Sequence, residues 1–195
     1  MFTPDDVWDN PAIAQYKRRM EGVERFLKKT TRKPVWGKLE TVDDVLEVAE
    51  PIIRAGVATN VLVDSATLGE MYGLNYPTTV PQDVYKRGVD KAVRDSRHFL
   101  DEDNKRAFVE AVIEDSVHNV SARVRWQTLD ANRRKIFRYR QSQFLIVPSI
   151  DACEFCRTCS EQLLHNPRWS GHVHCHCKTL PLLIDCLLYT SPSPR

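Results

Sequence analysis

Cysteine and histidine residues crowd one short segment near the end of the 195-residue chain. The segment opens with a C-x-x-C pair, Cys153 and Cys156. Thiolate sulfur and imidazole nitrogen are ligands that Zn²⁺ prefers, and two close ligand pairs separated by a loop are how a short chain surrounds a tetrahedral ion. The sequence therefore predicts a zinc-binding knuckle. Its further candidate ligands are Cys159, His172, His174, Cys175, His176 and Cys177.

These candidates exceed the four positions that a closed zinc site offers. Cys153 and Cys156 are the favoured first pair, because a C-x-x-C turn places two sulfurs beside one ion. For the second pair, the residues indicate Cys177 together with either Cys175 or His172. The segment has few large apolar residues, so the zinc would be structural and would take the place of a hydrophobic core.

Three other chemistries use similar residues. The run C-x-x-C-x-x-C belongs to some iron–sulfur ligand sets, but the expected fourth cysteine followed by proline is missing. A thioredoxin-like redox pair needs a βαβ unit, which the pattern does not indicate. A cysteine nucleophile with a histidine base is the third alternative, yet so many cysteines and histidines suit ligation better than catalysis. Asp115 and His118 form another acid/base pair, of a kind that arises by chance on most helices.

A basic strip precedes the knuckle and is interleaved with Trp126, Phe137 and Tyr139. Basic groups with aromatic rings can bind phosphate backbones and stack on bases. The same pattern also describes an exposed hairpin with one buried face. The strip is therefore a candidate nucleic-acid contact, comprising Arg123, Arg125, Arg133, Arg134, Lys135, Arg138 and Arg140.

Helical patterns dominate the first half of the chain. Asn10 followed by Pro11 predicts a helix start, and apolar residues from Ile13 to Leu27 then recur at spacings of three and four. Thr41 with Asp44 resembles a capping box for a second helix. Pro51 is expected to kink or restart that helix, and the segment from 76 to 81 is expected to be a turn-rich connector.

A third helical block begins near Gln82 and breaks around 101–103. Its later part places Val109, Ile113, Val117 and Val120 on one face. From Ser121 the pattern shortens, and Val124 and Trp126 alternate with arginines as in a strand. Two more strands are expected, at 136–139 and 144–147.

We expect an α+β fold with a helical region over 1–76, a second helical region running into a small β-hairpin over 82–148, and the zinc knuckle over 149–185. A net charge of +2 and 42% apolar residues are ordinary for a globular protein, and no apolar run is long enough for a membrane span. The acidic N-terminus lacks a secretion leader, so folding in a reducing cytosol is expected, where clustered cysteines usually bind metal. Residues 186–195 resemble a translated sequencing adapter and are expected to be non-native.

Three pieces of the chain resemble the phage Mu F-like minor head proteins, which include the actinobacteriophage group labelled capsid maturation protease. The first is the helical block ending at Asp115, with Arg123 after it. The others are Asp151-Ala-Cys-Glu-Phe-Cys156 and His172-Val-His-Cys-His-Cys177, the latter followed by Pro181. Positions matching the family's motif imply the ligand set Cys153, Cys156, His172, Cys175 and Cys177.

This resemblance implies a structural minor capsid protein of a tailed phage, active in head morphogenesis near the portal. Its partners would be portal and capsid or scaffold proteins, with DNA as a further candidate, and it would be assembled in the host cytoplasm and reside in the virion. The alternative is a protease that trims head proteins. No G-x-S-x-G elbow, HExxH helix or Ser-His-Asp set nominates its catalytic residues, so we expect a non-enzymatic role. A zinc-ribbon nucleic-acid-binding protein is the remaining hypothesis.

Overall fold

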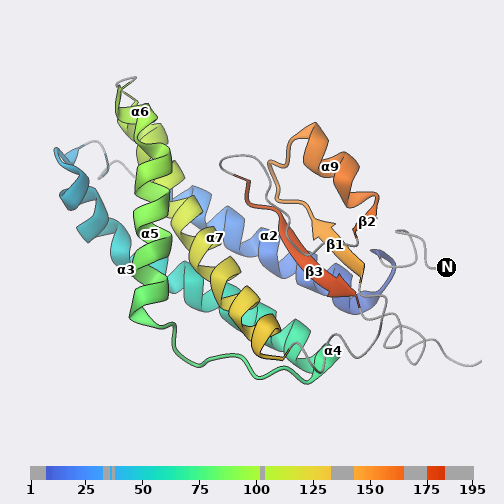
Figure 1. Cartoon of the computed structure of the whole chain (residues 1–195). Helices are drawn as coiled ribbons and strands as arrows, with labels where there is room; N and C mark the ends of the chain where they lie inside the picture. The colour runs from blue at the N-terminus through green and yellow to red at the C-terminus, as the bar shows by residue number, and fades with distance from the viewer. Residues whose placement is uncertain are drawn as a thin grey trace, which may run out of the picture.

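The structure is a computed structural model, which describes residues 8–32, 36, 38–101, 104–132, 143–164 and 175–182. Its long helices are α2 (Pro11–Thr31), α3 (Val42–Asp64), α5 (Gln82–Ser96) and α7 (Lys105–Ala131). Helix α7 packs against the other three, while a small sheet and the short helix α9 (Glu154–Ser160) lie to one side of the bundle (Figure 1). The α+β prediction, mainly helical with a small antiparallel sheet, is confirmed.

The starts of α2 and α3 follow their sequence signals. Asn10 accepts a hydrogen bond from the backbone of Ala12 at 2.9 Å, and Pro11 occupies the first helical turn. Thr41 and Asp44 bond reciprocally as a capping box. The predicted core-facing residues of α2 are all buried: Ile13, Tyr16, Met20, Val23 and Leu27.

Helix α3 runs unbroken through Pro51, so of the predicted kink or restart the restart is wrong. An internal proline removes one backbone hydrogen bond, at a cost of about 3 kcal/mol. Buried residues on both sides of it, Ala49 and Ile53 among them, keep the helix packed on the bundle. The helix then continues as a π-helical turn, Ser65–Gly69, and as α4 (Glu70–Tyr72), and it ends at Gly73 with a φ of 62°.

The predicted connector is confirmed, since non-helical backbone separates Tyr72 from α5. After α5 comes the short helix α6 (His98–Asp101), and α7 begins afresh at Lys105 with Asn104 as its cap. Buried residues on both sides of the connector, such as Val57 and Val84, pack in one apolar cluster. The core of the bundle is therefore continuous across this boundary.

The predicted face of α7, from Val109 to Val120, is buried as expected. The strand predicted around Val124 and Trp126 is wrong, because α7 continues to Ala131. Val124 prolongs the same buried face four residues after Val120. Packing of this face on α3 and α5 outweighs the strand preference of valine and tryptophan.

A buried ion pair crosses the bundle. The guanidinium of Arg125 donates to both carboxylate oxygens of Asp64, at 2.9 and 3.1 Å, and the hydroxyl of Tyr16 donates to the same carboxylate at 2.8 Å. These groups come from α7, α3 and α2 respectively. Because each buried polar group has a partner, the network fixes how the three helices meet.

The sheet has the order β2-β1-β3 and is antiparallel throughout. Its strands are β1 (Gln143–Val147), β2 (Leu163–Leu164) and β3 (Lys178–Leu182). The strand predicted at 144–147 is thereby confirmed, whereas the predictions for 136–139 and 186–195 concern residues outside the described part of the chain. One face of the sheet packs on α2 through Leu145 and Leu180. Among the described residues, no helix is long and apolar enough to span a membrane.

Candidate metal centre

Helix α9 supplies the first cysteines of the site. Cys153 is its N-cap residue and is exposed, whereas Cys156 lies in its first turn and is 0% exposed. The helix packs against β1, where Ile146 contacts the buried face that includes Cys156. A C-x-x-C spacing at the start of a helix thus points one thiol into the protein and leaves the other near the surface.

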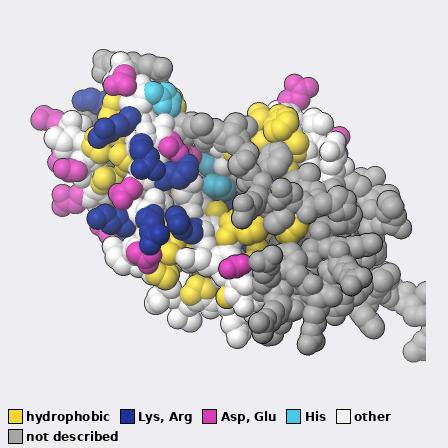
Figure 2. All heavy atoms as spheres, viewed as in Figure 1, with side chains coloured by type: hydrophobic (Ala, Val, Ile, Leu, Met, Phe, Trp, Pro, Cys, Tyr) yellow, Lys and Arg dark blue, Asp and Glu magenta, His cyan; other side chains and the backbone are white. Residues whose placement is uncertain are grey.

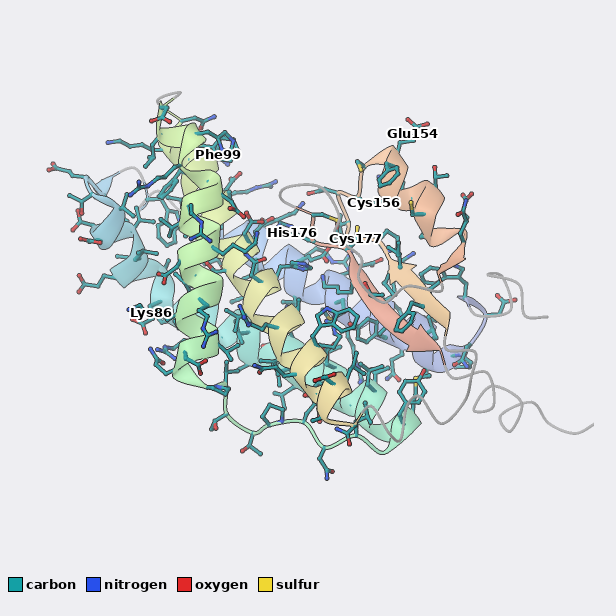
Figure 3. All side chains as sticks on the ribbon, viewed as in Figure 1. Lys86, Phe99, Glu154, Cys156, His176 and Cys177 are labelled. Atoms are coloured by element: carbon teal, nitrogen blue, oxygen red, sulfur yellow. The ribbon has the colours of Figure 1, made fainter. Side chains whose placement is uncertain are left out.

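The second group of cysteines leads into β3. Pairing of Val147 with Lys178 holds this segment beside β1 and opposite α9. The sulfurs of Cys156, Cys175 and Cys177 all lie within 4.8 Å of one another, and those of Cys156 and Cys175 are 3.6 Å apart. Cys156 and Cys177 face each other from α9 and from the segment just before β3 (Figure 3).

This spacing fits a single metal ion. Zn–S bonds of about 2.3 Å in tetrahedral geometry place sulfurs about 3.8 Å apart, close to the separation of Cys156 and Cys175. Three of the predicted ligands, Cys156, Cys175 and Cys177, therefore converge and can bind one ion together. Thiolate donors suit Zn²⁺.

Burial and mutual hydrogen bonds shift the pKa values of the three thiols in different directions. A hydrogen bond with the Cys177 thiol lowers the pKa of Cys175, and the same bond, with burial, raises the pKa of Cys177. Burial raises the pKa of Cys156 to about 12. Because a metal ligand must be the thiolate, binding releases protons and the affinity increases with pH.

Two of the predicted ligands remain candidates for a fourth position. Cys153 interacts with the thiol of Cys156 but does not belong to the close group of three. His172 and the further candidate His174 lie outside the described residues. Cys159 is half-buried and packs beside the cluster, also outside the close group.

His176 contributes to a different cluster, which the sequence patterns do not reveal. Its Nε2 lies 2.6 Å from a carboxylate oxygen of Asp115 and its Nδ1 3.6 Å from Glu114, both on α7. The rings of His118 and His176 are 5.6 Å apart, and burial is the main cause that lowers the pKa of His118 well below its ordinary value. Burial also raises the pKa of Glu114. Helical spacing places Asp115 near His118, but only the fold brings His176 to both.

Ion pairs with α2 anchor the same segment. The ammonium of Lys178 donates to Glu24 at 2.6 Å, and the second oxygen of that carboxylate accepts from the backbone of Ile150 at 2.8 Å. Lys28 pairs with Asp151 two residues before the C-x-x-C motif. The cysteine cluster is thus tied to α2 as well as to α7.

The predicted nucleic-acid strip is only partly described. Arg123 is exposed on α7. The structure corrects the prediction for Arg125, which is 3% exposed and bonded to Asp64, so no phosphate can reach it. The remaining strip residues, Arg133, Arg134, Lys135, Arg138 and Arg140, lie outside the described residues.

Exposed basic side chains also gather elsewhere. Figure 2 shows lysine and arginine side chains over α5 and the adjoining part of α7, interspersed with acidic ones. Arg87 pairs with Asp83 and Lys91 with Asp95 along α5. Such i, i+4 pairs are typical of a solvated helix face.

Comparison with protein-family profiles, with curated proteins and with solved structures found no match for this chain.

Proposed function

We propose that the chain is a structural minor capsid protein of a tailed phage, with a zinc ion that stabilises its C-terminal region. The observation that carries the proposal is the convergence of Cys156, Cys175 and Cys177 from two separate segments. These three residues occupy motif positions that resemble the Mu F-like minor head proteins. Three buried or half-buried thiols with a fourth protein ligand, for which Cys153 and His172 are the candidates, would make a closed site, as structural zinc sites are.

The zinc would act by joining elements that have little apolar surface between them. Cys156 belongs to α9, and Cys175 and Cys177 belong to the segment before β3. One ion bound to all three would fix the helix against the sheet. The segment before β3 also contacts α2 and α7, so the metal would hold the whole C-terminal region on the bundle.

Assembly of procapsids tests the proposed role. The wild-type gene and a Cys175→Ser, Cys177→Ser variant are each expressed with the portal, scaffold and major capsid genes of the phage that encodes them. We expect the wild-type protein in purified procapsids at low copy number, and the variant to be lost from them. A Cys159→Ser variant, changed outside the close group, should be incorporated normally. Procapsids that never contain the wild-type protein would overturn the proposed function.

A maturation protease remains the competing function, and the same experiment separates it. Trimming of the major capsid protein that depends on the wild-type chain would favour the protease. Unchanged masses of all head proteins in procapsids that contain the chain would favour the structural role.

A further inference from the structure

A polar cleft lies beside the cysteine cluster, between α2, α7 and the segment that carries His176. Its volume is about 370 Å³. Phe99 of α6 and the alanines Ala107 and Ala111 of α7 form an apolar part of its lining. Figure 3 labels Phe99 and His176, which come from different elements of the lining. The cleft therefore offers both apolar and charged surface to a ligand.

A smaller recess adjoins the cleft and shares four lining residues with it: Lys28, Glu114, Asp151 and His176. Its volume is about 30 Å³, which is the space of one small polar group. The recess is lined on another side by Asn60 of α3. A ligand that fills both spaces needs a small polar head and a longer apolar stem.

Asn60 indicates which chemical group the polar head of the ligand carries. The residue is 3% exposed, and its Oδ1 accepts no hydrogen bond from any residue that the structure describes. A buried acceptor without a donor is costly, so such atoms are normally bonded. The recess therefore requires a hydrogen-bond donor.

The charges around the two spaces indicate that the donor is a cation. Carboxylates outnumber the fixed cations of lysine and arginine: Glu24, Glu110, Glu114, Asp115 and Asp151 face Lys28, Arg32 and Lys178.

Most of these carboxylates already have close partners. Glu24 bonds to Lys178, Asp151 to Lys28, and Asp115 to His176. Glu114 has only a longer contact, 3.6 Å from His176 Nδ1. A further cation would therefore stabilise the carboxylate of Glu114 more than the others.

We propose that the cleft binds a primary ammonium group on an alkyl chain, as carried by a lysine side chain of a partner protein. The ammonium lies in the recess and donates to Asn60 Oδ1 and to Glu114. It has three donors and no acceptor, which suits Asn60 Oδ1 and the Glu114 carboxylate as its two acceptors, whereas a guanidinium is planar and larger. The alkyl chain lies along Phe99 and the two alanines of α7, as lysine stems commonly do on apolar surface. This inference goes beyond the proposed structural role and does not depend on it.

A titration of the full-length chain followed by ¹⁵N NMR tests the proposal. The probe is N-acetyl-lysine methylamide, and the matched probe is N-acetyl-norleucine methylamide, which has the same stem without the ammonium. We expect saturable shifts at the amides of Asn60, Glu114 and His118 with the lysine probe alone. Equal shifts with both probes, or none with the lysine probe, would overturn the proposal.

Two variants locate the binding in the recess. Glu114→Gln removes the charge and retains the shape, and it should weaken binding of the lysine probe about tenfold or more, because hydrogen bonds to charged groups are the strong ones. Asn60→Leu removes the unpaired acceptor and should weaken binding about threefold to tenfold. Glu50→Gln, on the exposed surface of α3, is the control and should bind the probe as the wild type does.

A single water molecule could instead satisfy Asn60. In that case the lysine probe would cause the same shifts in Asn60→Leu as in the wild type, and the proposal would fail. If Glu114→Gln does not fold, Asn60→Leu and the norleucine probe decide the question by themselves. Unaltered affinity for the lysine probe in Asn60→Leu would equally contradict the assignment.

Discussion

The helical bundle and the region from β1 to β3 hold together by different means. The bundle buries a continuous apolar cluster from α2, α3, α5 and α7. The cluster between α9 and the sheet is much smaller, and two of its four buried members are cysteines, namely Cys156 and Cys177. The first region can fold through the hydrophobic effect, and the sheet of the second packs on α2 through Leu145 and Leu180. By contrast, α9 and the segment before β3 have only the small cluster. Metal should therefore matter to α9 and the segment before β3, and hardly to the bundle.

Metal removal should produce the largest effect and separate the two regions. Structural zinc contributes roughly 10–16 kcal/mol to the folding of small metal-dependent peptides. We expect a chelator, or Cys156→Ser, to abolish hydrogen-exchange protection in α9 and in the segment before β3. The amides of α3, α5 and α7 should retain theirs, as measured by exchange and mass spectrometry. Cys159→Ser is the control, and uniform loss of protection across the chain would show that the regions are not distinct.

Breaking the buried ion pair should destabilise the bundle in the presence of zinc. Asp64→Asn leaves the guanidinium of Arg125 buried without its counter-charge, which typically costs about 3–5 kcal/mol. Glu50→Gln breaks an exposed pair with Arg54 and should cost less than about 1 kcal/mol. Urea unfolding followed by the helical circular-dichroism signal measures both. Similar losses of unfolding free energy for the two variants would show that the Arg125 network does not stabilise the bundle.

The helix contacts of the bundle can be tested with matched glycine substitutions. A Cβ on Gly88 would lie 2.4 Å from a methyl group of Val120 and 3.1 Å from its backbone nitrogen, so Gly88→Ala should destabilise by about 1–3 kcal/mol. A Cβ on Gly22 meets nothing within 4 Å among the described residues. Gly22→Ala should therefore stabilise α2 by about 0.5–1 kcal/mol. Thermal unfolding shows whether each variant is more or less stable than the wild type. A stabilising Gly88→Ala would show that α5 and α7 pack less closely than the structure indicates.

His118 lies where α7 of the bundle meets the segment that carries His176. Because its pKa is lowered in the folded protein, the unfolded chain binds more protons once the pH falls below about 6.5. The free energy of unfolding should then decrease with falling pH, by at most about 1.4 kcal/mol per pH unit from this residue. His118→Gln, compared at the same zinc concentration, should show a smaller decrease between pH 6.5 and 5. Parallel profiles for the two proteins would mean that His118 does not titrate on unfolding.

Local signals predict much of the bundle. The cap at Asn10, the capping box at Thr41 and the apolar spacing of α2 each involve residues within a few turns, so the sequence contains them directly. The strand predicted around Val124 fails because alternation over four residues is too short to distinguish strand from helix. Only packing against α3 and α5 decides it.

Contacts between distant residues explain what the sequence could not reveal. Arg125 looks like a surface residue of a basic strip, yet it meets Asp64 across 61 positions of the chain. His176 looks like a spare ligand within the motif, but it bonds to Asp115, also 61 positions away. The C-x-x-C and C-x-C spacings, by contrast, do indicate the three cysteines that converge, although they also include Cys153, which lies outside the close group.

The most direct test of the account is native mass spectrometry of the chain purified without added metal. We predict one zinc ion per chain, with Cys156, Cys175 and Cys177 protected from alkylation until the metal is removed. A metal-free mass for a folded chain in which these three thiols react at once would contradict it.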